Sequence, residues 1–171
     1  MKDTMLIRLY ILSKMLDAPT NPYRVFKDYQ NSTASRFQPI EEAKFYYNID
    51  LLHQRDYISQ VSVVPGENTP SKKMYAITQT GREFFENALY ERFASANSVD
   101  DLYLIFPFFE FIDKKRAQSI LGKRIMELER ELATIIEMAD DTFLVEYAIQ
   151  KRQFHLMYLK KILERIGTTH T

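Results

Sequence analysis

The sequence contains no cysteine, no tryptophan and only four glycines among its 171 residues. Without cysteine, a disulfide framework and a thiolate metal site are excluded, which suits a reducing compartment. Four glycines leave little material for the glycine-rich loops that cradle phosphates, and neither these motifs nor GxSxG are present. These absences argue against disulfide-stapled folds and nucleotide-dependent enzymes.

Long apolar runs are also missing from the chain. No stretch approaches the roughly 20 apolar residues that span a bilayer. The apolar segment at the N-terminus is interrupted by Arg8 and Lys14 and lacks a small-residue cleavage site, so we do not expect a signal peptide. We expect a soluble, cytoplasmic protein with no membrane partner, long enough for one large domain or two small ones.

Charge of one sign is not in excess, because 23 Lys and Arg residues balance 23 Asp and Glu residues. Divided after Arg92, the chain has 12 basic and 11 acidic residues before the division, and 11 and 12 after it. Neither half is a basic module, so any nucleic-acid footprint must be a local patch.

Candidate catalytic residues do not form a pattern. His53, His155 and His170 are far apart and match no metal-ligand spacing. The acidic pairs Asp100-Asp101 and Asp140-Asp141 stand at expected helix starts, where capping explains them more simply than catalysis. We predict a protein that is not an enzyme and needs no cofactor or metal.

The first half of the chain predicts three helices. The first begins at Asp3 or Thr4 and is apolar nearly all round, so it is expected to be buried on several sides. The second, 23–29, follows Asn21 and Pro22 in an N-cap and first-turn arrangement, and residues 31–38 are expected to form a loop. The third starts near Pro39 and buries Phe45, Ile49 and Leu52, which leaves an outer face of Lys44, Tyr47, Asn48, Leu51 and Arg55, with Tyr46 at its boundary.

A β-hairpin is predicted next, from strands 57–64 and 73–77 joined by the turn 65–70. Thr78 is expected to cap a helix over 79–94. Three helices, a hairpin and a further helix in this order are typical of a winged helix-turn-helix.

The second half is expected to be purely helical. A short aromatic helix over 99–111 is bent or ended at Pro107, Asp113 caps a long helix, and a last helix runs over 143–166 and is closed by Gly167. The long helix carries an apolar seam for another helix, made by Ala117, Leu121, Ile125, Leu128, Leu132, Ile135 and Ala139. The sequence thus predicts a mainly α protein with a small β-hairpin wing, divided into a winged helix-turn-helix domain (1–95) and a helical dimerisation domain (96–171).

Three segments resemble the PadR family of transcriptional regulators. Asn21-Pro22-Tyr23 stands where the family has His-Gly-Tyr, and the end of the third helix, 54–58, follows its Glu-Glu-Gly-Leu-Ile pattern with Asp56 in place of glycine. The most specific match is 71–83, SKKMYAITQTGRE, which is similar to the family's basic wing strand and the Leu-Thr-Glu-Glu-Gly-Arg that follows. The second half resembles, more loosely, the helical domain of longer and virulence-activator-type members.

The resemblance implies a homodimer that binds double-stranded DNA, with the third helix in the major groove and the wing on the backbone. Together with the outer face of the third helix, it nominates as DNA-binding residues Tyr23, Arg36, Lys44, Tyr46, Tyr47, Asn48, Lys72 and Lys73. The lysines can also be ordinary solvated surface. A dimer held by the first and the C-terminal helices would use Met5, Leu9, Leu12, Leu128, Leu132, Phe154, Tyr158, Leu159 and Ile162.

A ligand site is a further possibility, since some PadR regulators sense phenolic acids or drugs. Phe106, Phe109 and Tyr158 are the candidate lining of a pocket for a small aromatic effector, although an aromatic helix is more often part of the core. The combined prediction is a PadR-like regulator, a repressor on a pseudo-palindromic operator. The alternative is a winged-helix adaptor that no longer reads DNA. It is favoured by the neutral net charge and by Glu41 and Glu42, which stand in the first turn of the third helix.

Overall fold

The computed structural model describes residues 4–37, 39–66, 71–103, 105–138 and 142–168. The chain divides into two compact units, Met1–Asn87 and Ala88–Thr171, and the division falls within helix α5 (Gln79–Ser95). The domain boundary predicted after residue 95 lies at the end of the same helix and stays a prediction. Outside the described residues lie several positions named above: Asp3, the hairpin tip 67–70, Ala139, Asp140-Asp141 and His170.

The described part of the first unit begins with four helices before the hairpin: α1 (Thr4–Ser13), α2 (Pro22–Gln30), α3 (Thr33–Phe37) and α4 (Glu42–Gln54). Helix α4 contacts both α1 and α2, and Phe26 and Phe45 meet in the core with ring centroids 5.1 Å apart. The N-cap predicted at Asn21 is confirmed, because its side chain accepts a hydrogen bond from the Arg24 N–H. The loop predicted over 31–38 is wrong in part, since it contains α3, a helix too short and polar to show apolar periodicity.

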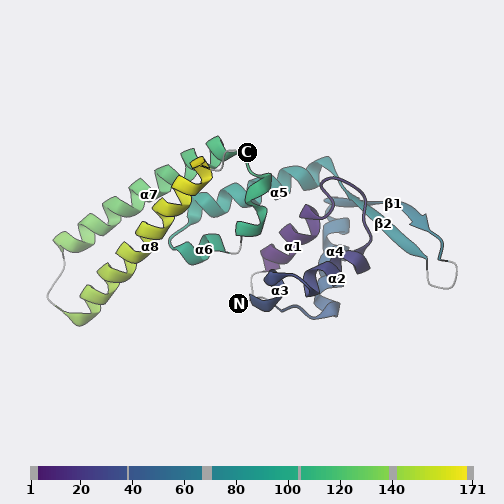
Figure 1. The fold of residues 1–171 in the computed structure, drawn as a ribbon, viewed down its shortest axis with the longest axis horizontal. Coiled ribbons are helices and arrows are strands. Elements are labelled where there is room, and N and C mark those ends of the chain that lie inside the picture. The colour runs from purple at the N-terminus through teal and green to yellow at the C-terminus, as the bar shows by residue number, and fades with distance from the viewer. Residues whose placement is uncertain (1–3, 38, 67–70, 104, 139–141, 169–171) are drawn as a thin grey trace. The chain divides into compact units, whose positions relative to one another are not determined.

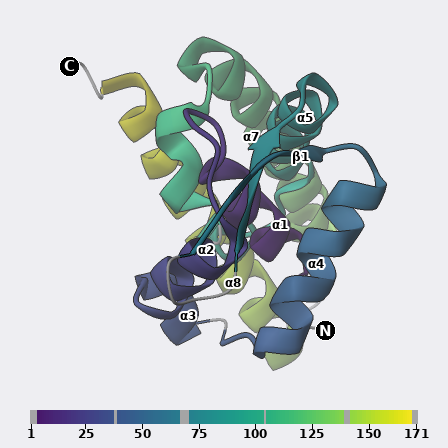
Figure 2. The same cartoon turned by 90° about the vertical axis from the view of Figure 1, so that its right-hand side faces the viewer.

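The hairpin follows α4 as two antiparallel strands, β1 (Ile58–Val64) and β2 (Lys72–Ile77). The register runs from the Ile58/Ile77 pair to the Val64/Lys72 pair and shifts between Gln60 and Ser62, which marks a β-bulge. At its base, β1 contacts α4 and β2 contacts α2 (Figures 1 and 2). Helices followed by a hairpin and α5 confirm the winged helix-turn-helix predicted from the sequence.

Hydrogen bonds of Thr78 join the turn between α4 and β1 to the start of α5. Asp56 adopts a φ of 57°, the left-handed conformation that glycine adopts most readily. The Thr78 hydroxyl donates to the Asp56 carbonyl (2.6 Å) and accepts from the Gly81 N–H (3.0 Å), which confirms Thr78 as the cap of α5. A Cβ at Gly81 would collide with the Tyr57 carbonyl oxygen, so this glycine is required by close approach.

The second unit contains α6 (Val99–Tyr103), the 3-10 helix η1 (Phe106–Phe111), α7 (Lys114–Glu137) and α8 (Phe143–Thr168). The two long helices α7 and α8 pack along each other (Figure 1). Asp113 caps α7 through its bond from the Arg116 N–H (2.7 Å), as predicted. Two expectations are wrong: the aromatic segment 99–111 forms two separate helices rather than one, and α8 continues through Gly167 instead of ending there.

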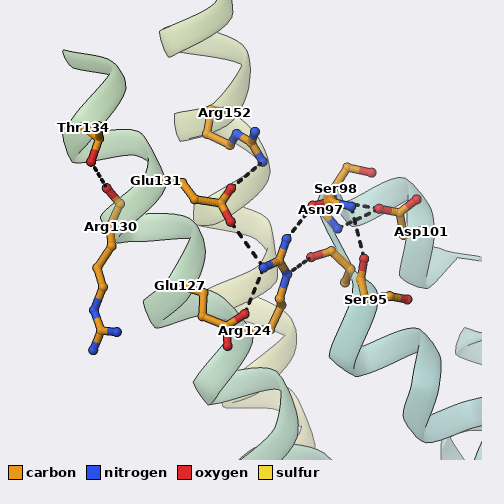
Figure 3. Close-up of polar contacts among 11 residues, drawn as sticks. Ser95, Asn97, Ser98, Asp101, Arg124, Glu127, Arg130, Glu131, Thr134 and Arg152 are labelled. Carbon is orange, nitrogen blue, oxygen red and sulfur yellow. Dashed lines mark hydrogen bonds and ion pairs between the residues drawn. The ribbon is translucent and has the colours of Figure 1, made fainter. Parts of the chain in front are cut away.

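Arg124 on α7 fixes the segment that leaves α5 (Figure 3). Its guanidinium donates to the Ala96 carbonyl (3.1 Å) and to the Asn97 side-chain oxygen (2.6 Å). It also pairs with Glu127 (2.9 Å) and more loosely with Glu131 (3.4 Å). With only 16% of its side chain exposed, Arg124 joins α7 to the start of the unit through polar contacts that are largely shielded from water.

Candidate functional site

Helix α4 presents the outer surface that the sequence nominated for DNA. Lys44 and Tyr47 are exposed, Tyr47 to 62%, because the apolar side of the helix is taken up by Phe45, Ile49 and Leu52 in the core. Tyr46 is half-buried, with its ring centroid 5.8 Å from that of Phe45. These placements leave Lys44 and Tyr47 open to a partner and give Tyr46 a share in the packing.

The Tyr46 hydroxyl remains a proton donor at neutral pH. Burial, reinforced by the nearby Glu42 carboxylate, raises the pKa of Tyr46 above its usual range. Because the phenol stays neutral, it can donate a hydrogen bond to a phosphate oxygen without adding negative charge.

Asn48 corrects the sequence prediction. It is fully buried, its amide donates to the Lys44 carbonyl (2.8 Å), and its side-chain oxygen accepts from the Arg8 guanidinium (3.0 Å). The prediction that Asn48 lies on the outer face and reads bases is therefore wrong. Its spacing to Phe45 and Leu52 already placed it on the inner side of the helix, and its polar character obscured that signal.

The other DNA candidates lie on α2, α3 and the hairpin. Tyr23, 57% exposed, stands in the first turn of α2 with the Lys27 amine 5.5 Å from its ring centroid. Arg36 is exposed on α3. Lys72 and Lys73 are exposed on β2, opposite Val64 and Val63 of β1. Every nominated residue except Asn48 thus has at least part of its side chain at the surface of the first unit.

Acidic side chains share the surface of α4. Glu41, Glu42 and Asp50 are all exposed, so this helix carries more carboxylates than amines on its outside. In a DNA complex they would have to lie away from phosphates, since carboxylates oppose a phosphodiester backbone. Exposed cations of the unit include residues on α2, on α3, at both ends of α4 and on the wing: Arg24, Lys27, Arg36, Lys44, Arg55, Lys72 and Lys73.

Most residues predicted to form the dimer interface are already buried within a single chain. Six of them are buried: Leu9, Leu12, Leu128, Leu132, Leu159 and Ile162. The α7 seam packs along α8 of the same chain, so apolar spacing identified a helix partner but not the molecule that supplies it. These six are covered within a single chain, whereas Met5 is half-buried, Phe154 is 50% exposed and Tyr158 is 37% exposed. Their role in a dimer interface stays a prediction.

One face of α8 carries an exposed aromatic row made by Phe143, Tyr147, Phe154 and Tyr158. Their spacings of four, seven and four residues place them along a single side of the helix. The first of them is 78% exposed, and the Phe154 and Tyr158 rings lie 4.9 Å apart. We call this set the aromatic row of α8.

The C-terminal end of this row borders a cavity of about 1010 Å³ within the second unit. One wall comes from α6, η1 and its flank: Val99, Phe106, Phe109 and Ile112. The other comes from α8: Phe154, Tyr158, Ile162 and Ile166. The structure thus brings together the three residues nominated as an effector pocket, with the Phe106 and Phe109 rings in edge contact at 5.1 Å.

Charged residues at this cavity were not anticipated from the sequence. Lys114, Lys161 and Arg165 line it together with Glu110. The Lys161 amine lies 4.8 Å from the Tyr158 ring centroid. A signal was available, because Lys161 and Arg165 follow Tyr158 at spacings that keep them beside it on a helix, but the wall formed by η1 could not be foreseen.

Within the described ranges, no group of three or more His, Cys, Asp or Glu side chains gathers as metal ligands would. No helix in the part of the chain that the structure describes has the length and apolarity to cross a membrane.

Comparison with known proteins finds no matching family model and no matching curated protein. Among solved structures, Bacillus subtilis PadR in complex with operator DNA is 15% identical, covers 94% of this chain and 99% of its own, and has a TM-score of 0.46. Bacillus subtilis PadR in complex with p-coumaric acid is 16% identical, with coverages of 95% and 99% and a TM-score of 0.43. The smu.1604c protein of Streptococcus mutans is 22% identical, with coverages of 96% and 98% and a TM-score of 0.41.

At identities and TM-scores this low, what the chain binds has to be argued from its own residues. The Bacillus subtilis PadR of these structures is a transcriptional regulator. This chain is similar, over nearly its whole length, to PadR transcription regulators of known structure.

Proposed function

We propose that this protein is a PadR-like transcriptional regulator that binds double-stranded DNA through its first unit. The observation that carries the proposal is the joint exposure of Lys44 and Tyr47 on α4 and of Lys72 and Lys73 on β2 of a winged helix-turn-helix. A helix of this kind fits the major groove, which is about 12 Å wide. The hairpin amines then neutralise phosphates beside it.

In the proposed complex, α4 and the hairpin make different kinds of contact with DNA. Tyr47 offers base edges an exposed ring and hydroxyl, while Lys44 and the partly buried Tyr46 donate to the flanking backbone. Lys72 and Lys73 supply affinity without sequence information, because phosphates are the same at every step. Tyr23 and Arg36 extend the backbone contacts from α2 and α3.

We further propose that the regulator works as a homodimer in the cytoplasm and represses by occupying a pseudo-palindromic operator. Two-fold symmetry in the protein would match half-sites about one helical turn, roughly 34–36 Å, apart. The aromatic row of α8 supports this proposal, because a second copy would remove exposed rings such as Phe143 and Tyr147 from water. An effector would release the DNA only if it binds one spacing of the two winged helices better than another.

A second candidate function is a winged-helix adaptor that contacts a protein and no longer reads DNA. The exposed carboxylates of Glu41, Glu42 and Asp50 on α4 favour it. The two functions differ in the partner that α4 contacts, and a DNA-binding experiment separates them.

The test is selection of duplexes from a randomised library at low salt, followed by equilibrium binding of the enriched sequence by fluorescence anisotropy. We expect an inverted repeat and two chains per duplex. Lys72→Ala with Lys73→Ala should weaken binding to every duplex, whereas the control Lys123→Ala with Lys151→Ala, on exposed positions of α7 and α8, should not. No enrichment and no binding above background at low salt would favour the adaptor.

A further inference from the structure

His53, in the last turn of α4, takes part in the turn that joins this helix to the hairpin. Its carbonyl oxygen accepts from the Asp56 N–H at 3.0 Å, while the Tyr57 N–H donates to the Leu52 carbonyl at 2.9 Å. Because Asp56 also has a positive φ, this pair of bonds is a Schellman motif, which ends a helix with a defined turn. The chain therefore leaves α4 on a fixed path into β1.

The imidazole of the same residue adds a second bond across this turn. Its Nδ1 lies 3.0 Å from the Ile58 carbonyl oxygen, at the first residue of β1. Because a carbonyl oxygen only accepts, Nδ1 carries the proton and donates, which leaves Nε2 without a proton in the neutral ring. The hydrogen bond thus selects one tautomer of His53 and ties the end of α4 to the start of β1.

The second strand is held at the same level of the hairpin. The Tyr75 ring lies edge-on to the His53 ring, with centroids 5.5 Å apart and planes at 78°. The Tyr75 backbone N–H donates to the Thr20 carbonyl (2.8 Å), and its carbonyl accepts from the Thr20 N–H (2.9 Å). The base of the hairpin is therefore held by both His53 and Thr20.

Beyond this base the hairpin is exposed. All side chains of β1 from Gln60 to Val64 are exposed, as are Lys72 and Lys73 on β2. Lys72 stands three residues from Tyr75, which is about 10 Å along a strand. A rotation of about 10° at the base would move Lys72 by about 2 Å, and such a shift is enough to break a hydrogen bond to a phosphate.

We propose that His53 is a positioning residue for DNA binding. Its Nδ1–H bond to Ile58 fixes the angle between α4 and the hairpin, so that Lys72 and Lys73 reach phosphates while α4 lies in the major groove. His53 acts through the two lysines and needs no contact with DNA itself. The orientation of the hairpin depends on contacts within the chain, and only its effect on DNA affinity rests on the proposed function.

Two substitutions separate this hydrogen bond from the rest of the side chain. In His53→Asn, the amide nitrogen takes the place of Nδ1, two bonds beyond Cβ, and can donate to the Ile58 carbonyl. In His53→Gln, the amide nitrogen stands one bond further out, and the bond to Ile58 is lost. Gln54→Ala, at the exposed neighbouring position, is the control for changes in the last turn of α4. Circular dichroism establishes that each variant is folded under the assay conditions.

We expect His53→Gln to weaken binding to the selected duplex about fivefold, the factor that one hydrogen bond commonly supplies. His53→Asn and Gln54→Ala should stay within about twofold of the wild type. Lys72→Ala with Lys73→Ala should cost less affinity in the His53→Gln background than in the wild type, because the lysines are already displaced. A loss of stability alone would leave the two effects additive.

Two measurements on the free protein test the orientation of the hairpin without DNA. Nitrogen-15 NMR of the neutral His53 ring should place its proton on Nδ1. Hydrogen exchange of the β1 and β2 amides should be about fivefold faster in His53→Gln than in His53→Asn, since the base of the hairpin opens more often without the bond.

Equal duplex affinities of the Asn and Gln variants, or additive effects in the cycle with Lys72 and Lys73, would overturn the positioning role. A proton on Nε2, or equal exchange rates in the two variants, would overturn the hydrogen bond on which this role depends. Absence of duplex binding would overturn the role together with the proposed function, whereas the NMR and exchange results would still decide whether His53 holds the hairpin.

Discussion

Replacing Asn48 by alanine should destabilise the first unit, although this position was nominated from the sequence as a DNA contact. The side chain is fully buried, and its oxygen accepts from the Arg8 guanidinium at 3.0 Å. In Asn48→Ala, the Arg8 donor loses this partner inside the unit and a small void replaces the amide.

The magnitude follows from these two losses. A hydrogen bond to a charged group contributes about 1.5–3 kcal/mol, and an unpaired buried donor costs a similar amount rather than an additional one. We therefore expect the free energy of unfolding to fall by roughly 2–3 kcal/mol. For a domain of this size, each 1 kcal/mol lowers the melting temperature by about 4–8 °C, so the expected decrease is on the order of 10–20 °C.

The neighbouring Tyr47→Ala is the matched control, because Tyr47 is 62% exposed on the same helix. It should leave the free energy of unfolding within about 0.5 kcal/mol and weaken binding to the selected duplex. Urea denaturation followed by circular dichroism measures the first quantity, and anisotropy measures the second. A stable Asn48→Ala protein that loses DNA affinity would refute the structural role assigned to Asn48.

Three further predictions concern the scaffold. Gly81→Ala should destabilise the first unit by several kcal/mol, about 3 or more by analogy with other backbone clashes, because its Cβ would strike the Tyr57 carbonyl; a melting temperature equal to that of the wild type would contradict the close approach. Arg124→Met, which removes the bonds to Ala96 and Asn97, should lower the free energy of unfolding by about 2–4 kcal/mol, and hydrogen exchange should rise first in the segment after α5. Burial, assisted by Asp28, raises the pKa of Tyr10 to about 12. The neutral Tyr10 side chain therefore stabilises the fold below pH 10, and this stabilisation is lost as the pH rises towards 12. Tyrosinate absorbance that increases in full near pH 10 with the fold intact would be inconsistent with this pKa.

Local signals in the sequence predicted local structure well. Asn21, Thr78 and Asp113 were identified as helix caps, and each accepts the expected backbone hydrogen bond. Caps are readable because the side chain and the N–H groups it satisfies lie within one turn of each other. The same holds for the hairpin, whose strands are marked by β-branched residues and a turn-forming segment.

Tertiary relationships were harder to predict. The spacing of Leu128 and Leu132 showed that α7 needs a helix partner, but it could not show that α8 of the same chain provides it. Asn48 has the spacing of a core residue and the polarity of a surface residue, and only the position of Arg8 explains why it is buried. The sequence interpretation gave more weight to the polarity of Asn48 than to its spacing, and it therefore placed this residue on the wrong side of α4.

The lining of the cavity in the second unit was predicted only in part. Phe106, Phe109 and Tyr158 were grouped for their aromatic character, and the structure places them in one cavity. The cations beside them went unnoticed, because the spacing of Lys161 and Arg165 is that of ordinary residues on a helical surface and does not show that α8 and η1 border the same cavity. The charge that lines a cavity therefore depends on tertiary contacts that linear spacing does not contain.

The most direct test of DNA binding is the salt dependence of affinity for the selected duplex. Each phosphate contact contributes about 0.9 to the slope of log K against log salt concentration. If Lys72 and Lys73 each contact a phosphate in both copies of a dimer, the slope should be smaller by up to about 3.6 in Lys72→Ala with Lys73→Ala. A slope that the substitutions leave unchanged would contradict the assignment of the hairpin to DNA, and no measurable binding at low salt would contradict the proposed function itself.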